Sequence, residues 1–398
     1  MRILYILSTC LILSGCLVII ISFIKNLNNK KWKLKKKKDL KFGVVIPARN
    51  ESSVIEELLK SLQVQMDTKD IYIIVEKATD KTVKIANKYG ANTYIRKNIT
   101  PERKRKGYAL DECFKYLLEQ KKKYDLYFIF DADNVVKENF IKEMLKTYEK
   151  GYLIASGYRN IKNNDNVYAT CSGLTFTMIN SLFNELKNKT NHSNIIMGTG
   201  YYIDSSLIKK WKGFPFHSLT EDYELSIYCS ENNISTYYNK NAEFYDEQPT
   251  TMKLSIIQRT RWVKGFLDCR KGKLKNIKND YERKFGIIPY LLILGGITIH
   301  LLTSIIGFII HLILKDTLFI RYLIYFVLCL LFLYLILFII TYIVIVHDME
   351  KLNMSGKNIL KTLFFNPIFL LSYLICFIKA IKTKELDWVT IDHNKTMY

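Results

Sequence analysis

The sequence predicts an α/β domain with a mostly parallel sheet, flanked by transmembrane α-helices. Between residues 41 and 270, short apolar runs of strand length alternate with amphipathic stretches of helical spacing, which is the pattern of β-α-β units. Toward both ends of the chain lie long apolar stretches without charged side chains, long enough to cross a bilayer. These two observations place one soluble domain between membrane-spanning segments.

The chain is strongly basic, with 59 Lys and Arg against 37 Asp and Glu and a formal net charge of +22. Such an excess is compatible with nucleic acid, anionic lipid or a phosphorylated substrate as partner. Much of it lies beside the apolar stretches, above all in residues 30–38, and no nucleic-acid-binding motif accompanies it. We therefore expect contact with a lipid bilayer and no binding of nucleic acid.

The cysteines of the chain are scattered singly. There are 8 of them, without a Cys-x-x-Cys pair and without the Cys and His spacing of a zinc site. We interpret them as small hydrophobic residues in a reducing compartment.

The first apolar stretch, residues 3–24, would be about 33 Å long as a helix, which is enough to span a bilayer. Positive charge follows it in residues 25–40, so we expect residues 1–24 to be a signal anchor with the N-terminus outside. The segment Leu13-Ser14-Gly15-Cys16 also resembles a bacterial lipoprotein cleavage box. Against that alternative, the apolar run continues past Cys16.

The α/β domain begins after the basic linker. Strands are predicted at residues 42–46, 71–75, 126–130 and 152–156, and helices at residues 52–64, 79–89, 107–119 and 138–150. The carboxyl ends of parallel strands meet at one edge of a sheet, where ligands bind. Pro47, Glu76 and Asp131, which follow three of these strands, should therefore face one crevice.

Two acids, Asp131 and Asp133, end the strand at residues 126–130 with one small residue between them. Carboxylates in this arrangement can hold a hard divalent cation such as Mg²⁺ or Mn²⁺, often shared with a substrate diphosphate. The alternative is an ordinary Asp-rich turn.

Three further motifs lie in the second half of the domain. In chain order they are Gly198-Thr199-Gly200; Thr220-Glu221-Asp222, where Thr220 can act as a helix N-cap; and Gln258-Arg259-Thr260-Arg261-Trp262, within the helical stretch 250–266. Taken singly, the two acids could be ordinary first-turn residues favoured by the helix dipole. Arg261 beside Trp262 could be a surface cation–ring pair.

The last third of the chain reads as membrane. Residues 287–314 and 322–346 can each span, and their short connection makes residues 287–346 an antiparallel hairpin. Basic residues in the linker 271–286 and in 351–361 put both of its ends on the cytosolic side. The last apolar stretch, residues 363–381, is broken at Asn366-Pro367 and has basic residues at both ends, which favours an interfacial amphipathic helix over a span within residues 347–398.

Four motifs thus stand in one order: residues 47–51, Asp131-Ala132-Asp133, Thr220-Glu221-Asp222 and residues 258–262. This set resembles the membrane-embedded family 2 glycosyltransferases, the branch of hyaluronan, cellulose and poly-N-acetylglucosamine synthases, over roughly residues 41–264. The resemblance implies a Rossmann-like fold of the GT-A type for residues 41–270. It also implies a nucleotide-sugar donor, usually UDP-linked, and an inverting transfer. Trp388-Val389-Thr390 resembles the gating loop of the processive members.

For the donor, the resemblance implies a nucleotide-sugar pocket lined by Pro47, Asn50, Glu51, Glu76, Lys106, Gly107, Asp131 and Gln258. Asp133 would coordinate the metal on the diphosphate, with Asp131 the second-ranked ligand. The family commonly has an Asp where this chain has Glu76, which leaves the choice of donor base open.

For the chemistry, the resemblance implies Asp222, Glu221 and Arg261 as catalytic residues, with Asp222 as the general base. A sugar hydroxyl is a poor nucleophile, so a carboxylate that accepts its proton is useful. The leaving diphosphate builds up negative charge that the metal and Arg261 can stabilise. Trp262 offers a flat apolar face for a sugar ring, and together with Gly198 and Gly200 it would bind the acceptor.

The function expected from the resemblance is synthesis of a β-linked extracellular or capsular polysaccharide by a multi-pass protein of the plasma membrane with a cytosolic catalytic domain. The small number of spans suggests a homo-oligomer or an accessory export subunit. It also favours the alternative, addition of a single sugar to a lipid acceptor, as in ceramide glucosyltransferases. A third possibility is a catalytically silent scaffold or export component, against which the joint presence of Asp131, Asp133, Asp222 and Arg261 argues.

Overall fold

The computed structural model describes residues 1–25, 39–190, 192–270 and 288–383. The chain divides into two compact units, one made of Met1–Lys30 with Leu274–Ile343 and the other of Lys31–Lys273 with Val344–Tyr398. The basic run 30–38, the linker 271–286 and the Trp388-Val389-Thr390 motif lie outside the described residues.

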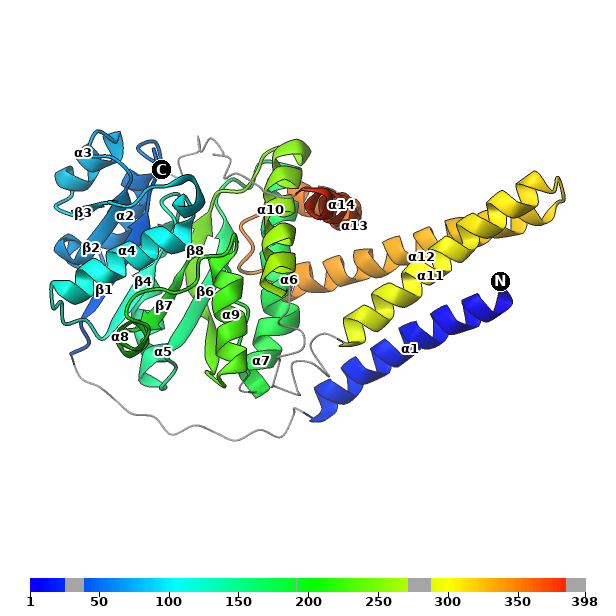
Figure 1. The fold of residues 1–398 in the computed structure, drawn as a ribbon, viewed down its shortest axis with the longest axis horizontal. Helices are drawn as coiled ribbons and strands as arrows, with labels where there is room; N and C mark the ends of the chain where they lie inside the picture. The colour runs from blue at the N-terminus through cyan, green and yellow to red at the C-terminus, as the bar shows by residue number, and fades with distance from the viewer. Residues whose placement is uncertain (26–38, 191, 271–287, 384–398) are drawn as a thin grey trace. The chain divides into compact units, whose positions relative to one another are not determined.

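The described part of the second unit is built on an eight-stranded sheet (Figure 1). The strands β1, β2, β3 and β4 are mutually parallel, and β6 pairs parallel with β8, while β7 runs antiparallel between β4 and β6. The predicted α/β fold with a mostly parallel sheet is confirmed. In sheet order the strands are β3 (Asn92–Ile95), β2 (Ile71–Val75), β1 (Phe42–Pro47), β4 (Leu126–Ile129), β7 (Tyr201–Asp204), β6 (Ile154–Ile161), β8 (Thr236–Asp246) and β5 (Val135–Val136).

Helices cover both faces of this sheet, which explains why its central strands are apolar on both sides. Val44, Ile73 and Phe128 pack with α2 (Ile55–Gln63) and α5 (Phe140–Glu149) on one face. The neighbouring residues Val45 and Ile129 pack on the other face with α4 (Lys106–Glu119), α8 (Ser205–Trp211) and α9 (Glu221–Glu231). The short α3 (Lys81–Lys88) follows β2.

Most predicted elements of the first half are present, with shifted ends. The strand predicted at 152–156 runs from Ile154 to Ile161 because its pairing with β8 continues past a bulge at Gly157 and Tyr158. The helix predicted from residue 52 begins at Ile55. β3 was not predicted, because its residues, exposed at both ends and half-buried between them, carry no apolar run.

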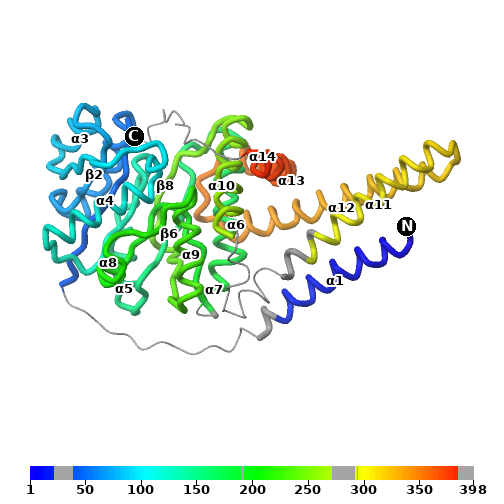
Figure 2. The backbone as a smooth tube through the Cα atoms, in the orientation of Figure 1, coloured from blue at the N-terminus to red at the C-terminus, as the bar shows by residue number. Residues whose placement is uncertain are grey.

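Three long helical stretches complete the described part of the second unit. One is α6 (Val167–Ile179), continued through a π-helical turn (Asn180–Asn184) into α7 (Glu185–Thr190), and it lies beside the second, α10 (Met252–Arg270), as Figure 2 shows. The third is α13 (Gly356–Leu371) with α14 (Tyr373–Lys382), which packs against α6 and α10.

The break predicted at Asn366-Pro367 is wrong. Pro367 lies inside α13, and the interruption comes at Ser372. Asn366 is buried with its amide 3.9 Å from Met178 Sδ of α6, and Arg259 of α10 donates to the Phe369 carbonyl at 2.9 Å. Tertiary packing therefore holds a helix that the local proline signal would end.

The first unit contains α1 (Arg2–Lys25), α11 (Ile288–Ile313) and most of α12 (Leu318–His347). Tyr5 and Ser304 hydroxyls lie 2.9 Å apart and join α1 to α11. Within the described residues, four helical stretches are long and apolar enough to cross a membrane: Arg2–Ile21, Gly295–Ile313, Leu318–His347 and Gly356–Lys382.

Candidate active site

The acidic loop after β4 is folded around the side chain of Asn134. The Asn134 Oδ1 atom accepts a hydrogen bond from the Asp131 amide at 3.1 Å and another from the Thr199 hydroxyl, which itself accepts from the Asp131 amide at 2.8 Å. Asn134 is fully buried, Asp133 is 7 % exposed and the Asp131 side chain is 36 % exposed. The loop thus presents one buried and one accessible carboxylate, separated by Ala132.

Lys106, the first residue of α4, joins three of the predicted motifs. Its Nζ forms an ion pair with Asp131, donates to the Gly198 carbonyl at 2.7 Å and lies 3.8 Å from Glu221 Oε1. Burial alone would lower the pKa of Lys106, but Asp131 and Glu221 outweigh it and raise that pKa. The side chain is therefore a fixed positive charge among the acids.

Glu221 and Asp222 begin α9. Burial raises the pKa of Glu221 to about 7, against the opposing effect of Lys106. Burial also raises the pKa of Asp222, while the Tyr223 amide, which donates to Asp222 at 2.8 Å, and the charges of Lys106, Arg261 and Arg159 oppose that rise. A carboxylate with a raised pKa is a better proton acceptor.

Thr220 occupies the N-cap position of α9, as predicted, but its side chain makes no capping hydrogen bond to a described residue. Its Oγ1 instead lies 3.8 Å from Cys269 Sγ of α10. A methyl group on Gly265 would approach this threonine to 2.5 Å. The close packing of α9 on α10 therefore takes the place of the expected cap.

The turn Gly198-Thr199-Gly200 lies against the Asp222 carboxylate. Gly198 and Gly200 have φ angles of +78° and +65°. A Cβ on Gly198 would lie 3.2 Å from Asp222 Oδ2, and a Cβ on Gly200 would lie 2.1 Å from the Phe244 ring. Both positions favour glycine, by backbone conformation and by space.

The motif on α10 reaches the same region. Trp262 packs edge-on against Phe176 at a centroid distance of 5.4 Å, and the Arg159 guanidinium lies 3.8 Å from the centroid of the same Phe176 ring. Arg261 acts on Asp222 through its charge. The Gln258 Oε1 atom is buried and accepts no hydrogen bond from any residue that the structure describes.

Four of the predicted nucleotide-side residues, Pro47, Asn50, Glu51 and Glu76, lie at the carboxyl ends of β1 and β2. β1 pairs with β4 and β2 pairs with β1. Pro47 ends β1, and the Glu51 carbonyl accepts from Val54 and Ile55 at the start of α2. Asn50 has a φ of +60°, and its backbone N–H donates to Asp80 Oδ2 at 2.9 Å.

Glu76 and Gly107 have close neighbours of their own. Glu76 forms an ion pair with Arg49 and lies 3.8 Å from Arg96, so its carboxylate is already held by arginine. A Cβ on Gly107 would lie 2.0 Å from the Phe216 carbonyl oxygen, which shows how closely the segment after α8 approaches α4.

Contacts in the structure therefore join Lys106, Asp131, Gly198, Glu221 and Asp222 into one cluster. Pro47, Asn50, Glu51 and Glu76 share a sheet edge with it, and Gln258, Arg261 and Trp262 come from α10. Sequence reasoning missed two residues of this region. They are Arg159, whose charge acts on Asp222, and Asp246, which accepts a hydrogen bond from Asn134. Asp246 could have been noticed as an acid at the end of a strand, but Arg159 lies inside β6 and has no local signal.

Asp131 and Asp133 fit a hard divalent cation by the chemistry of their donors. Both offer carboxylate oxygens, one residue apart, which is the ligand type that Mg²⁺ and Mn²⁺ prefer. The Asn134 amide nitrogen lies 3.3 Å from Asp133 Oδ1 and orients this carboxylate.

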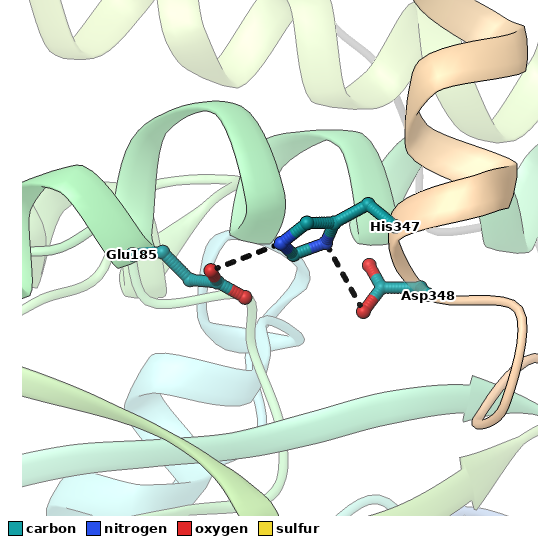
Figure 3. Close-up of side chains that lie close together, drawn as sticks. All are labelled: Glu185, His347 and Asp348. Carbon is teal, nitrogen blue, oxygen red and sulfur yellow. Dashed lines mark ion pairs between the residues drawn. The ribbon is translucent and has the colours of Figure 1, made fainter.

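A second acidic cluster, formed by Glu185, His347 and Asp348, is shown in Figure 3. His347 lies 3.5 Å from an oxygen of each acid. The Lys240 ammonium lies 2.5 Å from Asp348 Oδ1 and 3.2 Å from Glu185 Oε1. The positive charge of this lysine therefore already balances the two acids. We interpret this cluster as a link between α7, β8 and the end of α12.

Comparisons with known proteins agree with this fold. The family model described as "Glycosyltransferase like family 2" matches residues 40–265. The probable glycosyltransferase YdaM of Bacillus subtilis (strain 168) is 25 % identical over 287 residues, which cover 68 % of this chain and 67 % of YdaM.

Among solved structures, the mannosyltransferase PcManGT of Pyrobaculum calidifontis, in complex with GDP-Man and Mn²⁺, has a TM-score of 0.61 at 12 % identity and covers 96 % of this chain and 100 % of its own. The glucosyl-3-phosphoglycerate synthase of Mycobacterium tuberculosis gives a TM-score of 0.42 at 15 % identity over 61 % of this chain and 84 % of its own. Because the family match spans more than half of the sequence and contains all four motifs up to Trp262, the chain belongs to the family 2 glycosyltransferases and is a glycosyltransferase of the GT-A fold.

Proposed function

We propose that the protein is a membrane-bound inverting glycosyltransferase that moves a sugar from a UDP-sugar to a growing β-linked extracellular or capsular polysaccharide. The observation that carries the proposal is the cluster around Lys106, which ties the strand-end acid Asp131 to Gly198 and to the buried Glu221 of α9. One cationic side chain thereby contacts the predicted diphosphate end of the site and Glu221, and its charge acts on the predicted base Asp222.

In the proposed reaction the acceptor hydroxyl oxygen forms a bond to the anomeric carbon of the donor while the bond from that carbon to the diphosphate oxygen breaks. Asp222 takes the hydroxyl proton, and the electron pair of the broken bond leaves with the diphosphate. Arg261 stabilises the developing charge, and Trp262 supports the acceptor ring. Asp133, with Asp131, would hold a Mg²⁺ or Mn²⁺ ion, which when bound neutralises the diphosphate.

The donor base is the least constrained part of the proposal. The family resemblance favours uridine, whereas PcManGT has been solved with GDP-Man. In this chain Glu76, expected near the base, is paired with Arg49 and lies close to Arg96. A donor panel must therefore include GDP-mannose beside the UDP-sugars.

We propose that the protein is held in the plasma membrane by an anchor at residues 1–24 and a transmembrane hairpin at 287–346. The catalytic domain at 41–270 would then be cytosolic, and residues 347–398 would form an interfacial helix with a cytosolic tail. The interfacial position is supported by the two faces of α13 and α14. Phe369, Cys376 and Ala380 are buried, while Phe364 and Ile378 are more than half exposed. Export of a polymer would then need a second copy or an accessory subunit.

A second candidate function is transfer of a single sugar to a lipid acceptor. The small number of helical stretches that could span a membrane, four within the described residues, favours it. The size of the product separates the two candidates, because a ladder or a high polymer excludes single addition.

The test is a donor screen with membranes or detergent-purified full-length protein. Each UDP-sugar, and GDP-mannose, is incubated with Mn²⁺ or Mg²⁺, and release of the nucleoside diphosphate is followed. We expect release with at least one donor, and loss of release when the metal is chelated. Folded protein that releases nothing from any donor in the panel would rule out the proposal.

A further inference from the structure

The buried carboxylate of Asp246 lies at the end of β8 and is 2 % exposed. Its Oδ1 accepts a hydrogen bond from Asn134 Nδ2 at 2.8 Å. Its Oδ2 accepts from Arg159 Nε at 3.0 Å and from Gln248 Nε2 at 2.5 Å. Three side chains from different parts of the chain therefore converge on this one carboxylate.

Through its hydrogen bond with Asn134, Asp246 holds the acidic loop in place. The oxygen of the Asn134 amide faces the Asp131 amide and the Thr199 hydroxyl, which are donors, and its nitrogen faces the carboxylates of Asp246 and Asp133. A rotated amide would place donor against donor and oxygen against oxygen. The position of Asp246 thus fixes Asn134, and Asn134 fixes Asp131 and Asp133.

Through Arg159, Asp246 is also connected to the Gly198 turn and to the aromatic motif of α10. Arg159 NH1 donates to the Met197 carbonyl at 3.0 Å, directly before the Gly198 turn. The same guanidinium lies on the Phe176 ring, which packs against Trp262. One carboxylate therefore links the acidic loop with the turn beside Asp222 and with the aromatic motif of α10.

We propose that Asp246 is a positioning residue that holds the acidic loop and the Gly198 turn in the arrangement that binds the metal ion and the diphosphate. This inference rests on the proposed function. An amide at position 246 would have a single acceptor oxygen and could satisfy Asn134 or Arg159, but not both. The other side chain would keep its second partner, but one of its N–H groups would be buried against the new amide N–H, which displaces the acidic loop or the Gly198 turn.

The test is the isosteric variant Asp246→Asn in the full-length detergent-purified protein, with binding of Mn²⁺ in the presence of UDP followed by the EPR signal of free Mn²⁺. We expect at least about tenfold weaker Mn²⁺ binding than in the wild type, which is about 1.4 kcal/mol. The matched control is Asp204→Asn. Asp204 is also buried and accepts from Tyr148 and Ser206, but it pairs with Leu126 at the other end of β4 from the acidic loop.

Asp204→Asn should lower the melting temperature to a similar extent and leave Mn²⁺ affinity within twofold of the wild type. Equal Mn²⁺ affinity in Asp246→Asn and wild type, or equal losses in the two variants, would overturn the inference alone. A wild type that binds neither Mn²⁺ nor UDP would overturn the proposed function and the inference with it.

If Asp246→Asn does not fold, Arg159→Lys tests the second connection. Lysine keeps the positive charge beside Asp246 but cannot bind this carboxylate and the Met197 carbonyl in the forked geometry of a guanidinium. We expect turnover at least tenfold lower, with Mn²⁺ affinity changed less than threefold. Unchanged turnover in this variant would contradict the inference.

Discussion

Asp222 is the residue that we propose as the general base. Its carboxylate is anchored by the Tyr223 amide and faces the Gly198 turn, and burial raises its pKa. We expect Asp222→Asn to lower turnover by about 10²- to 10⁴-fold, because an amide of the same shape cannot accept the proton of the acceptor hydroxyl. Binding of the nucleotide sugar, measured by calorimetry, should change only a few-fold.

The control for this variant is Glu231→Gln, at the last residue of the same helix. It removes a carboxylate from α9 at the far end from the site, and we expect wild-type turnover. Turnover retained by Asp222→Asn would remove this residue from the role of base.

Glu221 makes the stability of the protein depend on pH. Its pKa in the folded protein, about 7, lies above the ordinary value of 4.5, so the folded state holds its proton more tightly than the unfolded chain does. The resulting stabilisation is complete below about pH 4.5 and is lost as the pH rises through about 7. Glu221→Gln cannot ionise. The melting temperature of the variant relative to the wild type should therefore rise from pH 5 to pH 8, as followed by circular dichroism, and a constant or falling difference would contradict this assignment.

Single residues differ in how far the sequence could identify them. Asp131, Glu221 and Asp222 stand at a strand end and a helix start, where an acid after an apolar run is conspicuous in the sequence. Asn134 and Arg159 carry no such signal, because their roles depend on Asp246, more than 80 positions away from either. Contacts of this kind become visible only when β6 and β8 are known to be paired.

At the scale of elements, the Gly198 turn gives a graded prediction. The reference position is Gly151, outside the turn, where φ is +89° and nothing lies within 4 Å of a Cβ. Gly151→Ala therefore adds only backbone strain, and we expect its free energy of unfolding to fall by about 1–2 kcal/mol. Gly200→Ala adds an overlap with the Phe244 ring and should be much less stable. Gly198→Ala should resemble Gly151→Ala in stability but lose at least about tenfold in kcat, because its methyl group would lie 3.2 Å from Asp222 Oδ2.

Urea unfolding and initial rates measure these effects. Gly151→Ala serves as the control, since it shares the positive φ without the contacts of the site. Equal stability of Gly200→Ala and Gly151→Ala, or full activity of Gly198→Ala, would contradict the interpretation of the turn.

Elements with strong local patterns were predictable, and those set by their neighbours were not. β2 is buried at every position and was predicted with its exact bounds, whereas β3 is an edge strand whose polar residues conceal it. Threonine is a residue type favoured at helix N-caps, but the Thr220 side chain packs against α10. Proline is a residue type that ends helices, but α6 and α10 hold the turn around Pro367.

At the scale of the whole molecule, the membrane arrangement remains a prediction that labelling can test. If α13 and α14 lie in the interface, both ends of this helical stretch face the cytosol, whereas a spanning helix would put them on opposite sides. Lys357→Cys and Lys382→Cys stand near the two ends, and both native side chains are exposed. In intact cells a membrane-impermeant maleimide should label neither variant above the wild-type background, and in inverted vesicles it should label both.

Thr317→Cys, in the connection between α11 and α12, should give the opposite result, because the predicted hairpin places this connection outside. Labelling of Lys382→Cys from outside would show that the stretch spans the membrane, and failure to label Thr317→Cys from outside would contradict the orientation of the hairpin.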